Sequence, residues 1–310
     1  MSLTDKFHKF SVYVYPRQAY WRKIENSKWK VDSKLGAFLG MHLKDRLIEN
    51  HYDKFDESGI PLRIVAGSKV YNYTTICSYA LANWEMYLES GEHDFTKPLW
   101  ATLNYLKKNN IPTDYGGIVF PGLGSLSAMN QGEALSVIAR CYELSKDREL
   151  IEFAKKVIEA FKVPVALNGV LGKFNTSQSI YWYEEMAIMP GKHILNGMCY
   201  ALVGLYEIDK VAPEITEANR LFKDGVQYLK QALPMFDQGN WSVYWVDDKP
   251  PHYIASMMYH NLHIVQLDYL FSITGEQILK EYSDLFTKYQ QSLLNRLSAG
   301  IKLIAGKLKS

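Results

Sequence analysis

The stretch YWYEEMAIMPGKHILNG, residues 181–197, contains two adjacent carboxylates, Glu184 and Glu185, directly after three aromatic side chains. Adjacent like charges repel, and surrounding aromatic groups remove the water that would relieve the repulsion, so the pKa values of such a pair tend to rise. A carboxyl group with a raised pKa can act as a general acid or base. The alternative is an exposed loop in which the two glutamates point to opposite sides.

Composition describes a folded protein that can bury a substantial core. The chain has 310 residues, of which 47% are hydrophobic and 22% charged. Its net charge of +2 gives no basic stripe of the kind that nucleic-acid binding requires, so we expect no nucleic-acid partner. Cys77, Cys141 and Cys199 are odd in number and far apart, which predicts buried apolar thiols rather than disulfides or a thiolate zinc site.

Targeting signals are absent from the printed sequence. No apolar run is long enough to cross a bilayer, and the first residues contain no signal-peptide core. We therefore expect no membrane span and take the cytoplasm as the default location. The opening Met-Ser-Leu could replace a removed leader, so an exported form stays open.

An internal repeat supplies the fold prediction. Four segments, residues 76–108, 130–161, 196–233 and 263–294, each contain two helical apolar patterns separated by a short polar turn. The first helix of each segment is richer in apolar and small residues, and the second carries a charged face, as inner and outer layers of a helical ring require. The pattern predicts an all-α protein, an (α/α) toroid of about four helical hairpins, with short β or extended segments in the connecting loops and the N-terminal region.

We expect three regions along the chain. Residues 1–70 form an N-terminal extended and helical segment packed on the toroid, with a helix within residues 31–50 and a turn at residues 57–59. Residues 71–297 form the toroid, and residues 298–310 a basic C-terminal tail. Glycine, proline and aromatic residues between the hairpins predict loops or short β-hairpins.

Polar side chains recur where the inner helices begin, so we expect them to gather on one face of the ring. Converging helix N-termini suit an anion, and amide, imidazole and aromatic groups together suit a sugar. We therefore predict an acidic polysaccharide or oligosaccharide as the partner, and a homodimer is one assembly left open. The alternative is that these residues only cap their helices. The residues are Tyr71, Asn72, Asn130, Gln131, Asn196, His260 and His263.

No cofactor or metal is predicted. Three-residue spacing on a helix would place His260 and His263 on one side, where they could bind a metal with His252 as a third ligand, but the sequence has no HExxH-type carboxylate companion. It also contains neither a GxGxxG dinucleotide motif nor a Walker loop.

Three segments resemble the helical catalytic domain of the D-glucuronyl C5-epimerases, which act on heparosan and heparan precursors. They are SAMNQGEALSVIARCYELSKD, WYEEMAIMPGKHILNGMCYALVGLYEI, and YHNLHIVQL with the preceding WSVY. The tract GIPLRIVAGSKVYNYTTICSYAL is similar to the family segment before the first hairpin. The resemblance covers about residues 52–294, and the chain looks like a short form without most of the family's β-structure.

The resemblance implies an enzyme that removes the C5 proton of glucuronate and returns a proton to the opposite face, giving iduronate. It assigns catalysis to Glu185, Tyr244 and Tyr259, surrounded by Tyr183, Glu184, Asn196, His260 and His263.

Two positions depart from the family pattern. Met186 stands where the family has a catalytic tyrosine, and the WSVY segment continues with Trp245-Val246-Asp247-Asp248 in place of a run that contains a basic residue. A tyrosine at position 186 would then be expected to raise inversion. Other readings stay open: a polysaccharide lyase, a glycosidase in which Asp247 or Asp248 faces Glu185, or an inactive glycan-binding protein.

Overall fold

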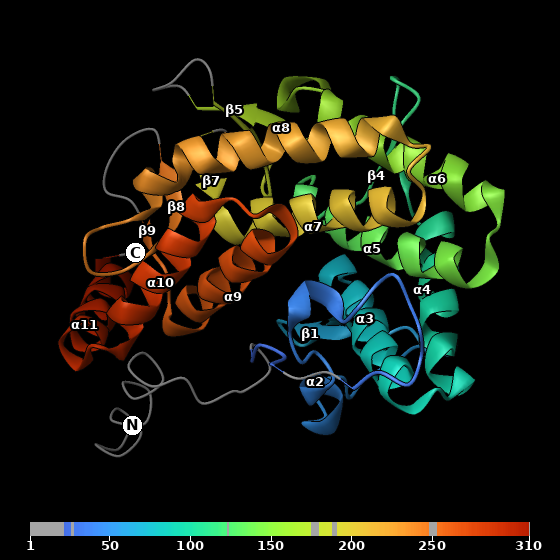
Figure 1. The fold of residues 1–310 in the computed structure, drawn as a ribbon, viewed down its shortest axis with the longest axis horizontal. Coiled ribbons are helices and arrows are strands. Elements are labelled where there is room, and N and C mark those ends of the chain that lie inside the picture. Colours follow the sequence, from blue (N-terminus) through green and yellow to red (C-terminus); the bar gives the residue numbers. More distant parts are fainter. Residues whose placement is uncertain are drawn as a thin grey trace.

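The computed structural model describes residues 22–25, 28–122, 124–174, 180–187, 191–247 and 253–309. Its long helices form four consecutive pairs, each with an inner helix followed by an outer helix (Figure 1). This arrangement confirms the predicted all-α toroid of four hairpins. The inner helices are α3 (Tyr73–Ser90), α5 (Ala128–Ser145), α7 (Leu195–Val211) and α9 (Met257–Thr274). The outer helices are α4 (Lys97–Lys108), α6 (Arg148–Glu159), α8 (Thr216–Ala232) and α10 (Gln277–Gln291).

Burial separates the two layers as their sequences predict. The inner helix α7 buries 14 of its 17 residues, whereas the outer helix α6 buries 5 of its 12 along one face. A helix that is apolar on all sides must be surrounded by other elements, and a helix with one apolar stripe can cover them. Consecutive inner helices therefore contact each other, and each also packs against its own outer partner.

Two glycines bring α5 and α7 into close contact. A Cβ atom at Gly132 would clash with the backbone of Tyr200 and Ala201, and one at Gly204 would clash with the backbone of Gly132. Larger residues at either position would push the two helices apart. The absence of side chains at these glycines fixes the spacing between the second turn of α5 and the second and third turns of α7.

The N-terminal segment fills the space between the first and last inner helices, as the blue ribbon in Figure 1 shows. It contains the short helices η1 (Phe38–Gly40) and α2 (Asp45–Ile48), and η1 contacts both α3 and α9. The predicted longer helix within residues 31–50 is therefore wrong. Leu39 and Gly40 both adopt a φ of 57°, which turns the chain so that Phe38 and Leu39 enter the core.

Short antiparallel strands occupy the connecting segments, in agreement with the predicted hairpins. The turn expected at residues 57–59 is also present, since the Asp56 carboxylate accepts hydrogen bonds from the backbone N–H groups of Ser58 and Ile60. Three sheets have two strands: β1 (Arg63–Val65) with β2 (Ser68–Val70), β3 (Ile111–Pro112) with β4 (Ile118–Val119), and β5 (Leu171–Lys173) with β6 (Tyr181–Tyr183). The fourth sheet contains β7 (Lys192–Ile194), β8 (Val243–Asp247) and β9 (Tyr253–Ile254), and 3₁₀ turns η2 (His93–Thr96), η3 (Ala160–Lys162), η4 (Val165–Leu167) and η5 (Leu233–Phe236) end or join helices.

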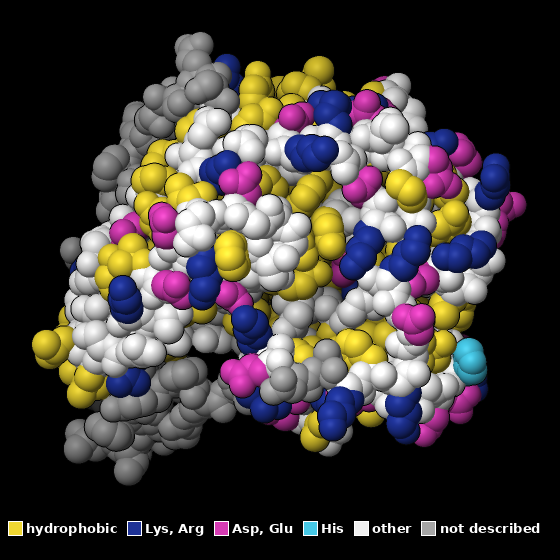
Figure 2. Space-filling view, viewed as in Figure 1, with side chains coloured by type: hydrophobic (Ala, Val, Ile, Leu, Met, Phe, Trp, Pro, Cys, Tyr) yellow, Lys and Arg dark blue, Asp and Glu magenta, His cyan; other side chains and the backbone are white. Residues whose placement is uncertain are grey.

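The last helix, α11 (Leu293–Lys309), contains the described part of the basic tail expected at residues 298–310 and begins before it. It docks through Ala299 and Leu303 against Trp241, Ile254 and Met257. These two side chains are covered by the protein itself, whereas Ile301 is exposed. Within the residues that the structure describes, no helix is both long and apolar enough to cross a bilayer. Figure 2 shows positive and negative side chains interspersed over the visible face, as the small net charge predicts.

A buried ion pair joins α5, α7 and the N-terminal segment. The Arg140 guanidinium donates to both carboxylate oxygens of Glu207, at 2.6 and 2.8 Å, and to the carbonyl oxygen of Gly36 at 3.0 Å. Both side chains are excluded from solvent, and the guanidinium also lies over the rings of Phe38 and Trp84. The ion pair therefore links the contact between α5 and α7 to the N-terminal segment, which lies between the first and last inner helices.

Replacing Glu207 with glutamine should lower the free energy of unfolding by about 3 to 5 kcal/mol, because Arg140 would keep a buried charge without its counter-charge. Urea unfolding followed by circular dichroism measures the change. Glu217→Gln is the matched control: Glu217 pairs with Arg220 on the exposed surface of α8, and its loss should cost less than about 1 kcal/mol. Equal effects of the two variants would contradict the structural role of the buried pair.

Candidate active site

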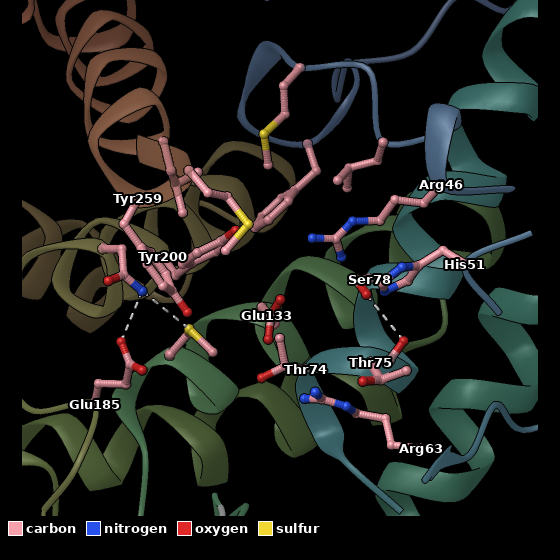
Figure 3. Close-up of a pocket in the computed structure, with 17 residues that line it drawn as sticks. Arg46, His51, Arg63, Thr74, Thr75, Ser78, Glu133, Glu185, Tyr200 and Tyr259 are labelled. Atoms are coloured by element: carbon pink, nitrogen blue, oxygen red, sulfur yellow. Dashed lines mark hydrogen bonds between the residues drawn. The ribbon is translucent and has the colours of Figure 1, made fainter. Parts of the chain in front are cut away.

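A cleft opens where the inner helices begin, on the face that the sequence predicted. Its volume is about 230 Å³, and its wall combines the first two turns of all four inner helices with the N-terminal segment (Figure 3). The inner helices contribute Thr74, Thr75 and Ser78 from α3, Met129 and Glu133 from α5, Asn196 and Tyr200 from α7, and Met258, Tyr259 and Leu262 from α9. The remaining wall consists of Phe38, Met41, Leu43, Arg46, His51, Arg63 and Glu185.

Glu185 enters the cleft from the loop after β6. The Asn196 side-chain amide donates a hydrogen bond to Glu185 Oε2 at 3.0 Å, and Gly197 leaves the space that the carboxylate occupies. A Cβ atom at position 197 would lie 2.6 Å from that oxygen. Burial raises the pKa of Glu185 to about 7, and the hydrogen bond from Asn196 opposes the rise. The carboxyl group can therefore exchange a proton near neutral pH.

Glu184 points away from the cleft, which corrects its prediction as a substrate-binding residue. It is buried beside His193, whose Nδ1 lies 2.8 Å from Glu184 Oε1, and it packs over Gly172. Its carbonyl oxygen accepts a hydrogen bond from the backbone N–H of Ala128, the first residue of α5. The two glutamates thus face opposite sides, as the alternative interpretation held, although neither lies in an exposed loop. Burial, rather than repulsion by its neighbour, dominates the raised pKa of Glu185.

Two tyrosines lie next to Glu185. Tyr259 lines the cleft from the first turn of α9, and Tyr244 lies behind it on β8, with ring centroids 4.4 Å apart. The hydroxyls of Tyr244 and Tyr259 share a hydrogen bond in which either phenol can be the donor. Burial raises the pKa of both phenols, and the negative charge of Glu185 raises them further. Both hydroxyls are therefore protonated at neutral pH.

Glu133 is a second carboxyl group in the cleft, which the sequence did not single out. It comes from the second turn of α5, is only 1% exposed, and its Oε2 has no hydrogen-bond partner. Burial raises its pKa well above the usual range, while the nearby Arg46 and a hydrogen bond with Thr74 oppose the rise. The sequence signal for Glu133 is a charged residue in the second turn of an inner helix that is rich in apolar residues.

Basic side chains from the N-terminal segment face these carboxyl groups. Figure 3 shows Arg46, from α2, and Arg63, from β1, pointing into the cleft on the side away from Glu185. His51 lies beside them, and its pKa is lowered by partial burial and by the positive charges of Arg46 and Arg63. The sequence prediction found no basic group for a substrate carboxylate. Arg63 lies in the GIPLRIVAGSK tract, which was the available signal.

Of the predicted residues at the start of α3 and α5, none lines the cleft. Tyr71 is exposed, donates to Asp56 at 2.9 Å and lies in a separate depression beside Tyr105. Asn72 caps α3 by accepting from the Thr75 backbone N–H at 2.9 Å. Asn130 accepts from the Thr74 hydroxyl at 3.0 Å and so supports a cleft residue from behind.

The other predicted polar residues brace the core. Gln131 is buried and bonds the backbone of Ile118, Phe120 and Val157. The hydroxyl of Tyr183 donates to the carbonyl oxygen of Leu221 at 2.8 Å, under complete burial. Gln131 and Glu133 are two positions apart on α5, yet their side chains face different neighbours. The direction of a side chain, more than its position along an inner helix, therefore decides whether it lines the cleft.

The histidines of α9 form a buried cluster rather than part of the cleft wall. Nδ1 atoms of His260 and His263 lie 2.7 and 3.0 Å from Ser242 Oγ, and His260 Nε2 lies 2.9 Å from the carbonyl oxygen of Phe286. Burial lowers the pKa of both imidazoles, so they are neutral at physiological pH. His252 and Asp248, and the side chain of Asp247, lie outside the described residues.

Within the described residues, one group of side chains has metal-ligand geometry: His42, Glu85 and Glu89, whose ligand atoms lie within 4.8 Å of one another. The Lys44 ammonium group pairs with Glu89 and lies 4.0 Å from Glu85. A protein cation therefore occupies the place that a metal ion would take.

Met186 also lies outside the cleft. It lines a separate depression with Leu171, Tyr181 and Glu184. The side chain at position 186 therefore does not occupy one face of the proposed reaction site. The expectation that a tyrosine here would restore a proton donor has no support in this geometry.

Together, the fold and the site define an (α/α) toroid with an ionisable cleft at the N-terminal ends of its inner helices. Residues 113–288 match the family described as D-glucuronyl C5-epimerase C-terminus. The match spans more than half of the chain, so the protein belongs to the D-glucuronyl C5-epimerase family.

Relatives support the same assignment. The chain is 28% identical over 226 residues to a D-glucuronyl C5-epimerase of Caenorhabditis elegans, covering 68% of this chain and 34% of the relative. It is 31% identical over 160 residues to an uncharacterized protein of Methanocaldococcus jannaschii, covering 51% and 50%. The chain thus spans a third to a half of the curated relatives that it matches.

Solved structures share the fold at low sequence identity. An α-1,6-mannanase from Salegentibacter has a TM-score of 0.56 and 14% identity, covering 81% of this chain and 70% of its own. A cellobiose 2-epimerase from Spirochaeta thermophila has a TM-score of 0.52 and 12% identity, covering 84% and 79%. Both likenesses establish the toroid architecture alone.

The raised pKa of Glu185 predicts a pH-dependent stability. Folding favours its protonated form, so this contribution is present below the usual pKa of 4.5 and is lost as the pH rises through about 7. The melting temperature of the wild type, relative to that of Glu185→Gln, should therefore fall between pH 4.5 and pH 7. Thermal melts of both proteins across this window measure the difference. A constant difference would contradict the raised pKa.

Proposed function

We propose that the protein is a C5-epimerase that acts on glucuronate-type residues of an acidic glycan. The observation that carries the proposal is one cleft in which Glu185, with a pKa near 7, shares a cavity with the guanidinium groups of Arg46 and Arg63. Membership of the D-glucuronyl C5-epimerase family supports this chemistry. The cleft volume of about 230 Å³ is below the roughly 300–1,000 Å³ of pockets for drug-sized ligands, so it suits one sugar residue of a longer chain.

The reaction begins with removal of a weakly acidic carbon-bound proton. Ionised Glu185 takes the C5 proton, and the electron pair moves into the adjacent substrate carboxylate to form an enediolate. That step is slow unless positive charge stabilises the developing oxyanion. Arg46 and Arg63 supply this charge at the substrate carboxylate, in place of the basic residue that the family run has and Trp245-Val246-Asp247-Asp248 does not.

Tyr259 has a positioning role in this proposal. When Tyr244 donates in the hydrogen bond that the two phenols share, the Tyr259 proton can be directed at a substrate oxygen or at Glu185. This bond also couples the orientation of Tyr259 to β8. We assign Tyr244 to holding Tyr259, and Asn196 to holding Glu185.

A polysaccharide lyase is the second candidate, because it would share the first step. A lyase must also protonate the C4 leaving oxygen, after which the carbanion eliminates instead of being reprotonated. The presence of Glu133 as a second carboxyl group in the cleft also keeps a glycosidase among the outcomes of the test. Product analysis separates the three: an inverted uronate, an unsaturated uronate, or a shortened chain with neither change.

Glu185→Gln should lower turnover at least ~100-fold, the usual scale of general acid–base catalysis, while leaving the fold intact. NMR of a desulfated heparosan-type polysaccharide incubated in D₂O measures both C5 deuterium and iduronate. Met186→Tyr is the control for a change at the neighbouring position and should leave inversion unchanged, since Met186 lines the separate depression. Full activity of Glu185→Gln would remove this residue from the mechanism.

Arg63→Gln should raise KM about 10-fold, because a charge-assisted hydrogen bond to the substrate carboxylate is lost. Binding of acidic oligosaccharides to the wild type should weaken with added salt, and this dependence should be smaller in the variant. Arg148→Gln, on the exposed start of the outer helix α6, is the matched control. Equal binding of neutral and acidic oligosaccharides by the wild type would contradict the electrostatic part of the proposal.

A further inference from the structure

The proposed reaction needs a second proton-transfer group, and the residues around Glu185 do not supply one on another wall. Tyr259 and Tyr244 contact each other, with ring centroids 4.4 Å apart, and both have positioning roles in the proposed mechanism. Met186 lines a different depression. Inversion at C5 requires that one group removes a proton and another delivers one from the opposite side of the carbon. The second group must therefore come from elsewhere in the cleft.

Glu133 is positioned to be this second proton-transfer group. Its carboxyl group lies deep in the cleft on α5, beside Thr74 of α3, whereas Glu185 is held by Asn196 of α7 (Figure 3). The side chain is 1% exposed and its Oε2 has no hydrogen-bond partner. A buried polar oxygen in this state is costly unless a ligand or another group completes its bonding.

Polar side chains beside Glu133 position its carboxyl group. The Asn130 amide nitrogen donates to the Pro121 carbonyl oxygen at 2.9 Å, so its Oδ1 is the atom that faces Thr74. The Thr74 hydroxyl donates to that Oδ1 at 3.0 Å. Thr74 also forms a hydrogen bond with Glu133 that favours the ionised carboxylate, but burial outweighs this bond. Burial therefore accounts for the neutral form of Glu133.

We propose that Glu133 is the second catalytic acid–base group of the cleft and transfers a proton at the face of the uronate ring opposite Glu185. This inference rests on the proposed epimerase function and extends it to a residue that neither the motifs nor the family resemblance assigned.

The proton balance of the pair is complete. Glu185 accepts the C5 proton of glucuronate as the C–H bond breaks, and the electron pair of that bond enters the substrate carboxylate. The carboxylic acid of Glu133 then gives its proton to C5 from the other face, forming the new C–H bond of iduronate. Glu185 ends neutral and Glu133 ionised, and exchange with solvent restores both. Burial, which raises the pKa of Glu133 well above its usual range, favours return of the neutral form.

The Arg46 guanidinium has a place in this cycle. Its positive charge acts on Glu133, lowering a pKa that burial otherwise raises. Arg46 therefore limits the cost of the ionised Glu133 that remains after the proton is delivered. The charge of Glu185 acts on Glu133 in the opposite direction and more weakly, which fits two carboxyl groups that share a cleft without touching.

Two isosteric variants test the pair in D₂O, with desulfated glucuronate-type and iduronate-type polysaccharides as separate probes. Glu133→Gln should lose inversion at least ~100-fold but still exchange the C5 proton of glucuronate, because Glu185 can remove and return it on one face. The same variant should fail to exchange iduronate. Glu185→Gln should give the reverse pattern, with exchange of iduronate and none of glucuronate. A merely structural role of Glu133 would reduce both exchanges together.

Glu85→Gln is the matched control. Glu85 is likewise fully buried on an inner helix, but it bonds the Lys44 backbone N–H and lies 2.7 Å from His42 Nδ1, outside the cleft wall. It should leave the ratio of inversion to exchange unchanged. Normal inversion by Glu133→Gln, or loss of both exchanges by a folded variant, overturns the role of Glu133 alone. A wild type that neither exchanges nor inverts the polymers overturns the epimerase proposal itself.

Discussion

The ion pair between Arg140 and Glu207 is the interaction on which the cleft depends. It is buried, doubly hydrogen-bonded and extended to the Gly36 carbonyl oxygen, so α5, α7 and the N-terminal segment cannot move independently. Buried charges are tolerated only when such bonds replace their hydration. The close backbone contact at Gly132 and Gly204 sets the distance between the two helices, and the ion pair fixes the chain that lies across them.

The N-terminal segment completes the wall of the cleft between the first and last hairpins. By packing η1 between α9 and α3, it both fills the gap between the ring ends and delivers Arg46 and Arg63 to the cleft. Helix N-termini alone carry only partial charge, and they are partly satisfied here by caps such as Asn72 and Ser127. Full positive charge comes from the two arginines. The proposed recognition of a substrate carboxylate therefore depends on a segment outside the repeat.

Desolvation organises the chemistry of the cleft. Glu133 and Glu185 belong to different elements, yet burial is the largest cause of the raised pKa at each. A hydrogen bond opposes the rise at each group, from Asn196 at Glu185 and from Thr74 at Glu133. Burial outweighs both bonds, and it raises the pKa of Glu185 to about 7 and that of Glu133 well above the usual range. In the proposed cycle, this difference lets Glu185 accept a proton and Glu133 give one.

The sequence by itself determined the repeat, the inner and outer layers, the hairpin-rich loops and the convergence of helix starts, because each follows from local periodicity and turn chemistry. It also identified the segments that bring Glu185, Asn196 and Tyr259 to the cleft. Only the tertiary structure decided the opposite directions of Glu184 and Glu185, the bracing roles of Gln131 and Tyr183, and the arrival of Glu133, Arg46 and Arg63 in one cavity. Contacts between elements that are distant in the chain decide which side chains are buried together. The periodicity of the sequence does not predict those contacts.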